Sequence, residues 1–231
     1  ITQSIFIELF KNGSIIEDLR PNIYDPVEGT TIADAEVERL PRRTNLVDVK
    51  WVCEDGTTIE ISTTRPELIC ACGVVVVHPD DERYTHLVGK RIHLPMPVQG
   101  RETSVEIMTH PSVKSDFGSG VLMVCSFGDQ NDVAIFRELG LTPFQAINLE
   151  GKMTDLAGPF AGQTVLGARK NAIEHLDAQG LIINNIVREQ EIPVSERGKN
   201  PVEIILLKEW YVRQTHAQDR ICLLYTSDAA D

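Results

Sequence analysis

The fold is decided by residues 45–52, NLVDVKWV, and residues 57–62, TTIEIS. In both stretches apolar and polar residues alternate, which is typical of a strand with one buried face. Residues 54–56, EDG, lie between them and predict a tight hairpin turn. The sequence thus predicts an antiparallel hairpin that opens a β-meander.

Further strands are predicted on the C-terminal side of this hairpin. Residues 73–77, GVVVV, form an unbroken apolar run that predicts a strand buried on both faces, and the turn formers Pro79-Asp80-Asp81 end it. Shorter runs predict three more strands, at residues 105–108, 120–125 and 181–187.

Two helices are predicted between these strands. The first covers residues 131–139 and ends at Gly140, and the second covers residues 165–178, with Thr164 as its N-cap and Gly180 at its end. Together the elements predict an α+β fold, a β-rich barrel or sandwich with helices packed on it.

The N-terminal part is predicted to contain a short amphipathic helix. Ser4 is its expected N-cap and Gly13 its stop. Residues 20–29 are rich in turn formers, and regular structure is expected to return at residues 31–38.

Composition limits the class of protein. The 231 residues are 42% hydrophobic and 24% charged, which suits one good core or two small ones. No run reaches the roughly 18 apolar residues that a membrane span needs, and the first residues carry no targeting pattern. We therefore expect a cytoplasmic protein with no membrane partner.

Cysteine usage indicates reduced thiols rather than a metal site. None of the cysteines forms the Cys-x-x-Cys spacing that a zinc site requires. We expect them in or near the core, and we expect no metal ligands. The five are Cys53, Cys70, Cys72, Cys125 and Cys222.

The net charge of −12 argues against a general nucleic-acid binder, because non-specific affinity comes from neutralising phosphates with Lys and Arg. A local basic rim is compatible with this average. Such a rim would suit a domain that receives only the end of a strand in a narrow pocket.

Residues 63–67, TTRPE, are the first candidate site. Thr63 and Thr64 place two hydroxyls at a strand end, and Pro66 keeps Arg65 extended. The alternative is purely structural: the threonines are strand formers, and Arg65 pairs with Glu67 or another carboxylate at the surface.

The glycine turn Gly118-Ser119-Gly120 is the second candidate site, because glycines allow backbone to approach a ligand closely. Taken alone, this pattern equally describes a turn into a strand.

Asp129 and Asp132 are the third candidate site, at the start of the predicted helix 131–139. One carboxylate can face a pocket and pair with a cationic group such as an α-ammonium. The structural alternative is that Asp129 caps the helix and Asp132 stabilises its dipole.

These motifs, in this order, resemble the hydrolytic editing domain of the valyl, isoleucyl and leucyl group of class I aminoacyl-tRNA synthetases. Residues 78–84, HPDDERY, resemble the valyl branch in particular. Residues 5–9, 24–26 and 31–38 resemble the entry to the insertion. Residues 210–212 resemble its return to the catalytic core, so the likeness extends to about residue 217. The isoleucyl and leucyl branches remain alternatives.

Some positions depart from the bacterial valyl pattern. Ser126-Phe127-Gly128 stands where many bacterial sequences have Pro-Ala-His, and Met123 stands where a lysine is frequent. The pattern looks more like archaeal sequences.

The resemblance implies an internal fragment of a longer chain. Residues 1–44 would lead in from a Rossmann-type class I catalytic domain, residues 45–192 would form the editing domain, and residues 193–220 would return to the catalytic domain. Residues 221–231 continue no pattern and are expected to be a non-native tail.

The resemblance also implies a role for each site residue. Asp129 and Asp132 are the expected catalytic residues. Asp129 would bind the α-ammonium of the substrate. Asp132 and a threonine hydroxyl of the protein would bind the side-chain hydroxyl of the substrate threonine. Arg65 would hold the terminal adenosine or its phosphate, and the glycine turn would shape the ester site. The expected substrate-binding residues are Thr63, Thr64, Arg65, Glu67, Gly118, Ser119 and Gly120.

The implied substrate is the 3′ end of tRNA(Val) that carries threonine, because a hydrophobic pocket for valine rejects its hydroxyl isostere poorly. The nucleotide-binding motifs HIGH and KMSKS are absent from the sequence. ATP and Mg would therefore act in the parent enzyme, which joins valine to tRNA(Val), and we expect no cofactor here. The rival hypothesis is a module that docks the tRNA end without hydrolysing it.

Overall fold

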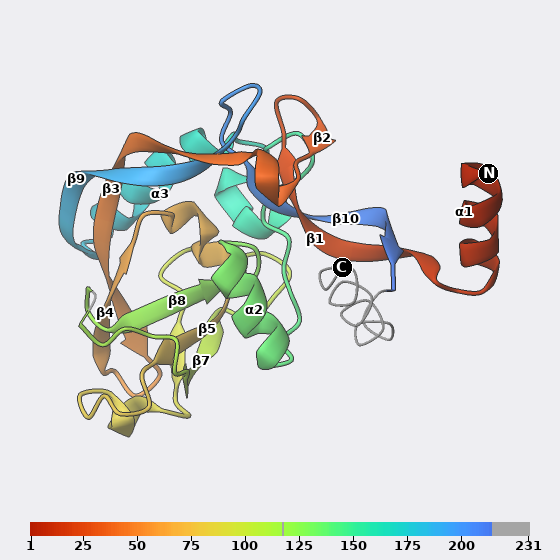
Figure 1. Ribbon diagram of the computed structural model, residues 1–231. Coiled ribbons are helices and arrows are strands. Elements are labelled where there is room, and N and C mark those ends of the chain that lie inside the picture. Colours follow the sequence, from red (N-terminus) through yellow and green to blue (C-terminus); the bar gives the residue numbers. More distant parts are fainter. Residues whose placement is uncertain (117, 214–231) are drawn as a thin grey trace, which may run out of the picture. The chain divides into compact units, whose positions relative to one another are not determined.

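A computed structural model describes residues 1–116 and 118–213 (Figure 1). Phe117, Cys222 and the expected tail at 221–231 lie outside the described residues. The described residues divide into two compact units, residues 1–20 with 206–213, and residues 21–116 with 118–205. No helix in the described ranges is long and apolar enough to cross a membrane.

The smaller unit contains helix α1 (Thr2–Lys11), the start of strand β1 (Ile15–Asp25) and most of strand β10 (Glu203–Val212). The edges of the Phe6 and Phe10 rings pack on Trp210, with centroids 5.6 and 5.5 Å away. The predicted cap at Ser4 is wrong, because the helix begins earlier and the Ile5 N–H already bonds the Ile1 carbonyl.

Strand β1 also corrects the prediction of a turn-rich stretch at residues 20–29. The strand continues to Asp25, where it pairs antiparallel with β2 (Thr30–Thr31), so that Tyr24 faces Thr31. Pairing thus overrides the local turn preference, and only residues 26–29 turn.

The larger unit is built on a curled sheet. Its hydrogen-bonded order is β4-β3-β6-β7-β5-β8, with β9 paired to β3, and its end strands β4 and β8 lie close together. All neighbours are antiparallel except β5 and β7. The strands are β3 (Val37–Cys53), β4 (Thr58–Thr63), β5 (Cys72–Val77), β6 (Arg91–His93), β7 (Ser104–Thr109), β8 (Val121–Cys125) and β9 (Ile182–Ser195).

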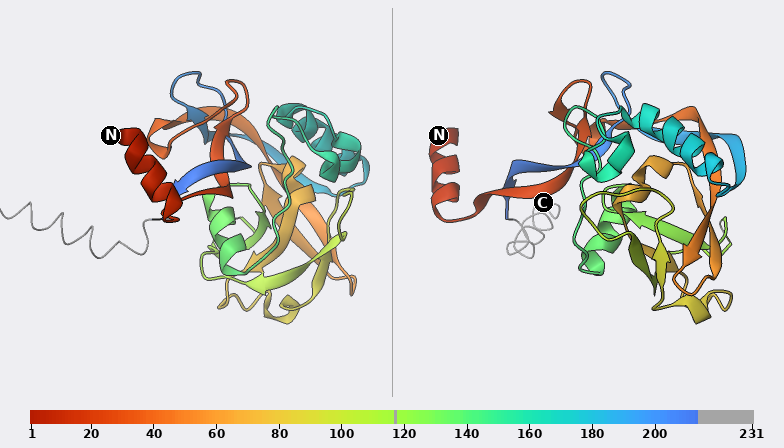
Figure 2. Two further views of the ribbon diagram at one scale, coloured as in Figure 1. Left: turned by 90° about the vertical axis from the view of Figure 1, so that its right-hand side faces the viewer. Right: turned by 180° about the vertical axis from the view of Figure 1, so that it is seen from behind.

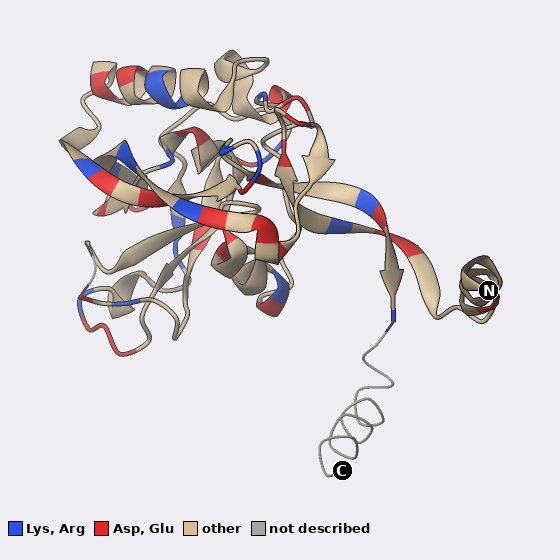
Figure 3. Ribbon diagram, turned by 45° about the horizontal axis from the view of Figure 1, so that its top comes forward, with Lys and Arg blue, Asp and Glu red and all other residues tan. Residues whose placement is uncertain are grey.

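The hairpin predicted at residues 45–62 is confirmed as β3 and β4, with Trp51 opposite Ile59. Strand β3 is longer than predicted because its first half pairs with β9 along a ribbon, from Val37 opposite Ser195 to Val49 opposite Ile182. Acidic and basic residues both line this ribbon (Figure 3). The domain limits predicted at 44/45 and 192/193 fall within these two strands and stay a prediction.

The helices pack on the sheet as predicted. Helix α2 (Gln130–Glu138) begins at the N-cap Asp129, and α3 (Val165–Ala178) begins at the N-cap Thr164. Helix α3 lies against β9 and the 3₁₀ helix η2 (Figure 2). The 3₁₀ helices are η1 (Asp34–Glu36), η2 (Pro66–Ala71), η3 (Thr85–Leu87) and η4 (Asp155–Phe160). The α+β class is confirmed, and the Rossmann-type origin of the flanking segments stays a prediction.

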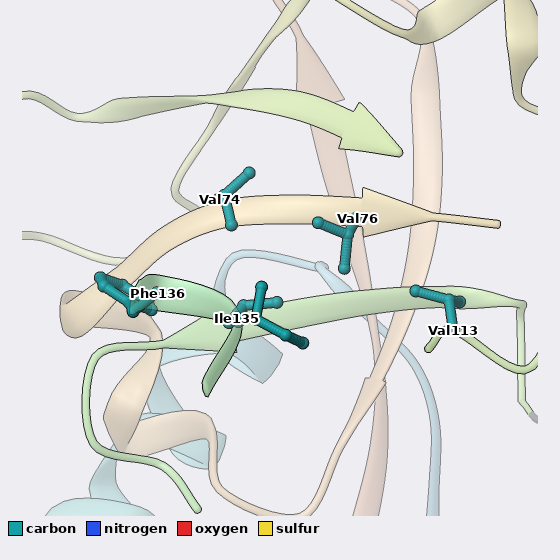
Figure 4. Close-up of a cluster of buried hydrophobic side chains, with 6 residues drawn as sticks. Val74, Val76, Val113, Ile135 and Phe136 are labelled. Carbon is teal, nitrogen blue, oxygen red and sulfur yellow. The ribbon is translucent and has the colours of Figure 1, made fainter. Parts of the chain in front are cut away.

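One core cluster joins α2 to the buried strand β5 (Figure 4). Ile135 and Phe136 of α2 contact Val74 and Val76, which are fully buried. A side chain at Gly73 would overlap the Phe136 ring, so the glycine at the start of the apolar run leaves room for the helix. This packing fixes the position of α2, whose N-terminus carries Asp129 and Asp132.

Candidate functional site

The TTRPE motif lies where β4 ends. Thr63 is the last residue of β4, is 9% exposed, and pairs with Val47 of β3. Its hydroxyl accepts a hydrogen bond of 3.0 Å from the Arg65 N–H, which closes a local turn. Thr64 is half-buried, and Pro66 begins η2. The strand end therefore turns sharply and sends Arg65 away from β4.

Arg65 is the centre of the site, because its three guanidinium nitrogens donate to three different groups. Nε donates to Glu67 Oε1 at 3.0 Å, and Nη2 donates to Glu203 Oε2 at 2.8 Å. Nη1 donates to the Gly128 carbonyl at 3.4 Å. The last contact spans 63 residues and ties the TTRPE motif to the turn before Asp129.

Glu67 balances the charge of two arginines. Arg169 of α3 donates to both of its oxygens, at 3.0 Å from Nε and 2.8 Å from Nη2. Burial raises the pKa of Glu67, but the charges of Arg65 and Arg169 outweigh burial and hold this pKa below its usual value. Likewise, burial lowers the pKa of Arg65, while Glu203 and Glu67 raise it above its usual value. The group is thus a buried, neutral quartet of two Arg and two Glu.

Asp129 and Asp132 have different environments although they belong to one helix start. Asp129 is exposed, and its Oδ1 accepts the Asp132 N–H at 2.8 Å as an N-cap. Asp132 is 9% exposed, and its Oδ2 accepts the Cys125 N–H at 3.1 Å. The cap predicted as the structural alternative for Asp129 is therefore present, and it leaves the second oxygen of Asp129 without a partner among the described residues.

The Asp132 carboxyl has an unusual protonation equilibrium. Burial and the negative charge of Asp129 raise its pKa to about 8, against the smaller opposing effects of the Cys125 N–H and Arg65. At neutral pH this carboxyl is largely protonated and can donate a hydrogen bond. The pair thus offers one exposed carboxylate and one neutral acid.

Gly128 leaves the space that the Asp132 carboxyl occupies. A side chain at position 128 would overlap Asp132 Oδ2. The Ser126-Phe127-Gly128 departure from the bacterial pattern is therefore compatible with the acid pair. Ser126 is buried and supports the same turn, since its hydroxyl donates to the Ala71 carbonyl at 3.2 Å and accepts the Phe144 N–H at 2.7 Å.

The glycine turn is not brought next to the acid pair. Gly118 to Gly120 precede β8, whereas the turn before Asp129 follows it, and the five residues of β8 span roughly 17 Å at the rise of an extended strand. A side chain at Gly118 would lie 3.3 Å from Ser62 Oγ, so the turn lies beside the end of β4. The glycine turn and the turn before Asp129 therefore lie at opposite ends of β8.

Arg169 and Glu203 were missed by the reasoning from sequence. Glu203 stands among the apolar residues Val202, Ile204 and Ile205, and a carboxylate in such a run requires a buried partner. The sequence could therefore have indicated that Glu203 has a buried partner, but it could not indicate which residue that partner is. Arg169 gives no local signal, because an arginine in a helix is ordinarily exposed.

The cysteines and histidines contribute structure to this region. Cys70, Cys72 and Cys125 are buried free thiols, as expected, and burial raises the pKa of Cys70 and of Cys72 to about 12. His110 bonds Ser112 and Glu138, away from the acid pair. Within residues 1–116 and 118–213, no group of three or more His, Cys, Asp or Glu side chains is arranged to hold a metal ion.

The sequence is similar to valine–tRNA ligases of archaea. It is 40% identical over 222 residues to that of Aeropyrum pernix, which covers 96% of this chain and 26% of the relative. The ligase of Nanoarchaeum equitans is 40% identical, over 96% of this chain and 29% of the relative. The ligase of Methanopyrus kandleri is 38% identical, over 90% of this chain and 23% of the relative. The chain thus spans about a quarter of the length of these relatives.

Other comparisons are less informative. No family model matches the chain. A solved structure of the Agrobacterium radiobacter K84 LeuRS with tRNA and LeuAMS covers 88% of this chain and 32% of its own, at 18% identity and a TM-score of 0.46. A likeness of that size carries no argument.

Proposed function

The chain belongs to the valine–tRNA ligase family, and from this premise we propose that it forms a proofreading site that hydrolyses threonine esters of tRNA(Val). The similarity to archaeal members agrees with the residues at 123 and 126–128. The finer assignment, hydrolysis of a threonine ester, is our proposal and rests on the site.

One observation carries the proposal: Arg65 Nη1 bonds the Gly128 carbonyl and so joins the TTRPE motif to the acid pair. Without this contact the two motifs would be a strand end and a capped helix. With it, the Thr63 and Thr64 end of β4 and the Asp129 and Asp132 end of α2 belong to one site. The acids and hydroxyls of this site suit a small, cationic, hydroxylated group.

The proposed chemistry begins with the amino acid. The exposed Asp129 carboxylate binds the α-ammonium of the ester. The neutral Asp132 carboxyl donates a hydrogen bond to the threonine side-chain hydroxyl, and a hydroxyl of Thr63 or Thr64 completes its recognition. Valine has no hydroxyl, so the acid proton of the buried Asp132 is left without an acceptor and valine binds more weakly.

Hydrolysis is the addition of water to the ester carbonyl carbon. The bond from this carbon to the ribose oxygen breaks, that oxygen takes a proton from the water, and threonine leaves with a new carboxyl group. No histidine among the described residues bonds Asp129 or Asp132, and we propose that positioning of the water and the ester supplies the rate. A separate hydrolytic site is needed because a pocket that binds valine cannot strongly reject threonine, which has a similar shape and one additional hydroxyl.

The remaining residues are assigned to the nucleic-acid end of the substrate. Because the glycine turn lies at the far end of β8, we propose that Gly118, Ser119 and Gly120 contact the terminal nucleotide rather than the ester. Arg65 and Glu67 are engaged in the buried quartet, and we propose that they act on the substrate by fixing the turn at Gly128. ATP-dependent joining of valine to tRNA(Val) is proposed for the whole protein.

The proposal is tested by single-turnover hydrolysis with the protein in excess, which offsets weak tRNA binding. The substrates are threonyl-tRNA(Val) and valyl-tRNA(Val), and Asp129→Ala is the loss-of-function variant. We expect selective hydrolysis of the threonyl ester that is lost in the variant. Asp177→Ala, at an exposed carboxylate near the end of α3, is the matched control and should hydrolyse normally.

Two results would overturn the proposal. A folded protein that binds the tRNA end without hydrolysing it would be a docking module. Full hydrolysis by folded Asp129→Ala would remove the acid pair from the mechanism.

A further inference from the structure

Residues 78–84, HPDDERY, have no role in the proposed chemistry, yet they contain a rigid ion pair. Arg83 donates to Asp81 through two bonds, Nε to Oδ1 at 2.8 Å and Nη2 to Oδ2 at 2.6 Å. Asp81 is 7% exposed and lies four residues after Val77, the last residue of β5. This two-point pairing fixes the plane of the guanidinium group.

The segment bonds the backbone at two points, one in the loop before the glycine turn and one at the middle residue of the turn. Arg83 Nη2 also donates to the Ser115 carbonyl at 2.8 Å. The neighbouring Tyr84 hydroxyl donates to the Ser119 carbonyl at 2.8 Å. Both acceptors are backbone oxygens, so the contacts fix the path of the main chain rather than a side chain.

Gly120 is required by the same arrangement. Its φ is +78°, which disfavours other residues, and a side chain there would lie 2.5 Å from Arg83 Nη2 and 2.9 Å from the Ser115 carbonyl. The glycine thus leaves the space that the guanidinium needs to reach Ser115. Position 120 and Arg83 depend on each other.

We propose that Arg83 and Tyr84 are positioning residues that set the glycine turn for the terminal nucleotide of the RNA, a role that rests on the proposed function. The turn lies beside Ser62 at the end of β4, one residue before Thr63. The acid pair lies at the far end of β8. The two residues therefore act on binding of the nucleotide end and not on the hydrolytic step.

The test uses Tyr84→Phe, which removes one hydroxyl, and Arg83→Lys, which keeps the charge but loses the two-point geometry. Arg91→Lys, at a half-buried arginine of β6, is the matched control. We expect KM for threonyl-tRNA(Val) to rise about fivefold in Tyr84→Phe, the size of one hydrogen bond, and more in Arg83→Lys, with kcat unchanged. The control should match the wild type.

Amide hydrogen exchange of the peptide covering residues 114–121 gives a readout that does not need activity. Exchange should be faster in both variants and unchanged in the peptide covering residues 129–136. Unchanged exchange in both variants would overturn the inference. Faster exchange would also overturn it if KM stayed unchanged or if only kcat fell. If the wild type does not hydrolyse the ester, the proposed function fails, and the exchange result alone decides whether Arg83 and Tyr84 hold the turn.

Discussion

Arg65 and Glu203 are 138 residues apart in the sequence and form an ion pair of 2.8 Å, with 24% and 8% of their side chains exposed. Through this pair strand β10 contacts the strand-end motif of β4. The other two guanidinium nitrogens of Arg65 bond Glu67 and the Gly128 carbonyl, so one side chain connects three segments of the chain.

Removing the charge of Glu203 should therefore destabilise the fold. We expect Glu203→Gln to lower the free energy of unfolding by about 3 kcal/mol, because the largely buried Arg65 guanidinium loses one of its two carboxylate partners. Urea denaturation followed by circular dichroism measures it. The control is Glu38→Gln, which breaks a half-exposed pair with Lys199 and should cost less than about 0.5 kcal/mol. Equal losses of stability in the two variants would show that the Arg65–Glu203 pair contributes no more to stability than a half-exposed pair does.

The raised pKa of Asp132 predicts a pH dependence of stability. The pKa of its carboxyl is about 8 in the folded protein, whereas the unfolded carboxyl loses its proton near the ordinary aspartate pKa of 3.8. Its contribution to stability is therefore complete below the unfolded pKa and is lost as the pH rises through about 8. Asp132→Asn keeps an acceptor for the Cys125 N–H and does not titrate.

The measurement is the free energy of unfolding of wild type and Asp132→Asn between pH 5 and pH 9. We expect the variant to gain stability relative to the wild type as the pH rises, with the difference levelling off above about pH 8. Parallel curves would contradict the raised pKa.

Gly128→Ala should damage the site more than the fold. The new methyl group would overlap Asp132 Oδ2 and push the carboxyl away from the Cys125 N–H. We expect threonyl ester hydrolysis to fall about tenfold or more, as for a misplaced reacting group. Gly167→Ala in α3 is the control, with unchanged hydrolysis, because its methyl group would meet the Thr164 hydroxyl at 3.1 Å and not the acid pair. Normal hydrolysis by Gly128→Ala would show that the Asp132 position is unimportant.

Gly73→Ala should destabilise the core. The added methyl group would overlap the Phe136 ring and displace α2 from β5, at an expected cost of about 2 kcal/mol in the free energy of unfolding. A double-mutant cycle with Phe136→Leu checks the cause, because the smaller side chain should recover part of the loss. If the losses of the two single variants simply added in the double variant, the cost of Gly73→Ala would not come from overlap with the Phe136 ring.

Local pattern was sufficient for most of the elements. The alternation at residues 45–62, the apolar run at 73–77 and the caps Asp129 and Thr164 are each set by residues near in sequence, and each is found as predicted. The misses occur where pairing overrides local preference. Strand β1 passes through residues 20–25 because β2 pairs with its end.

The sequence by itself determined the hairpin at residues 45–62, the strand at 73–77, and helices α2 and α3 with their caps, because periodicity and capping are properties of neighbouring residues. The resemblance to the family came from the short motifs, which are also local. Only the tertiary structure decided that Arg65 meets Gly128 and Glu203, that Arg169 neutralises Glu67, and that the glycine turn lies away from the acid pair. The physical reason is that a buried charge needs a partner, but the curl of the sheet determines which distant residue supplies it.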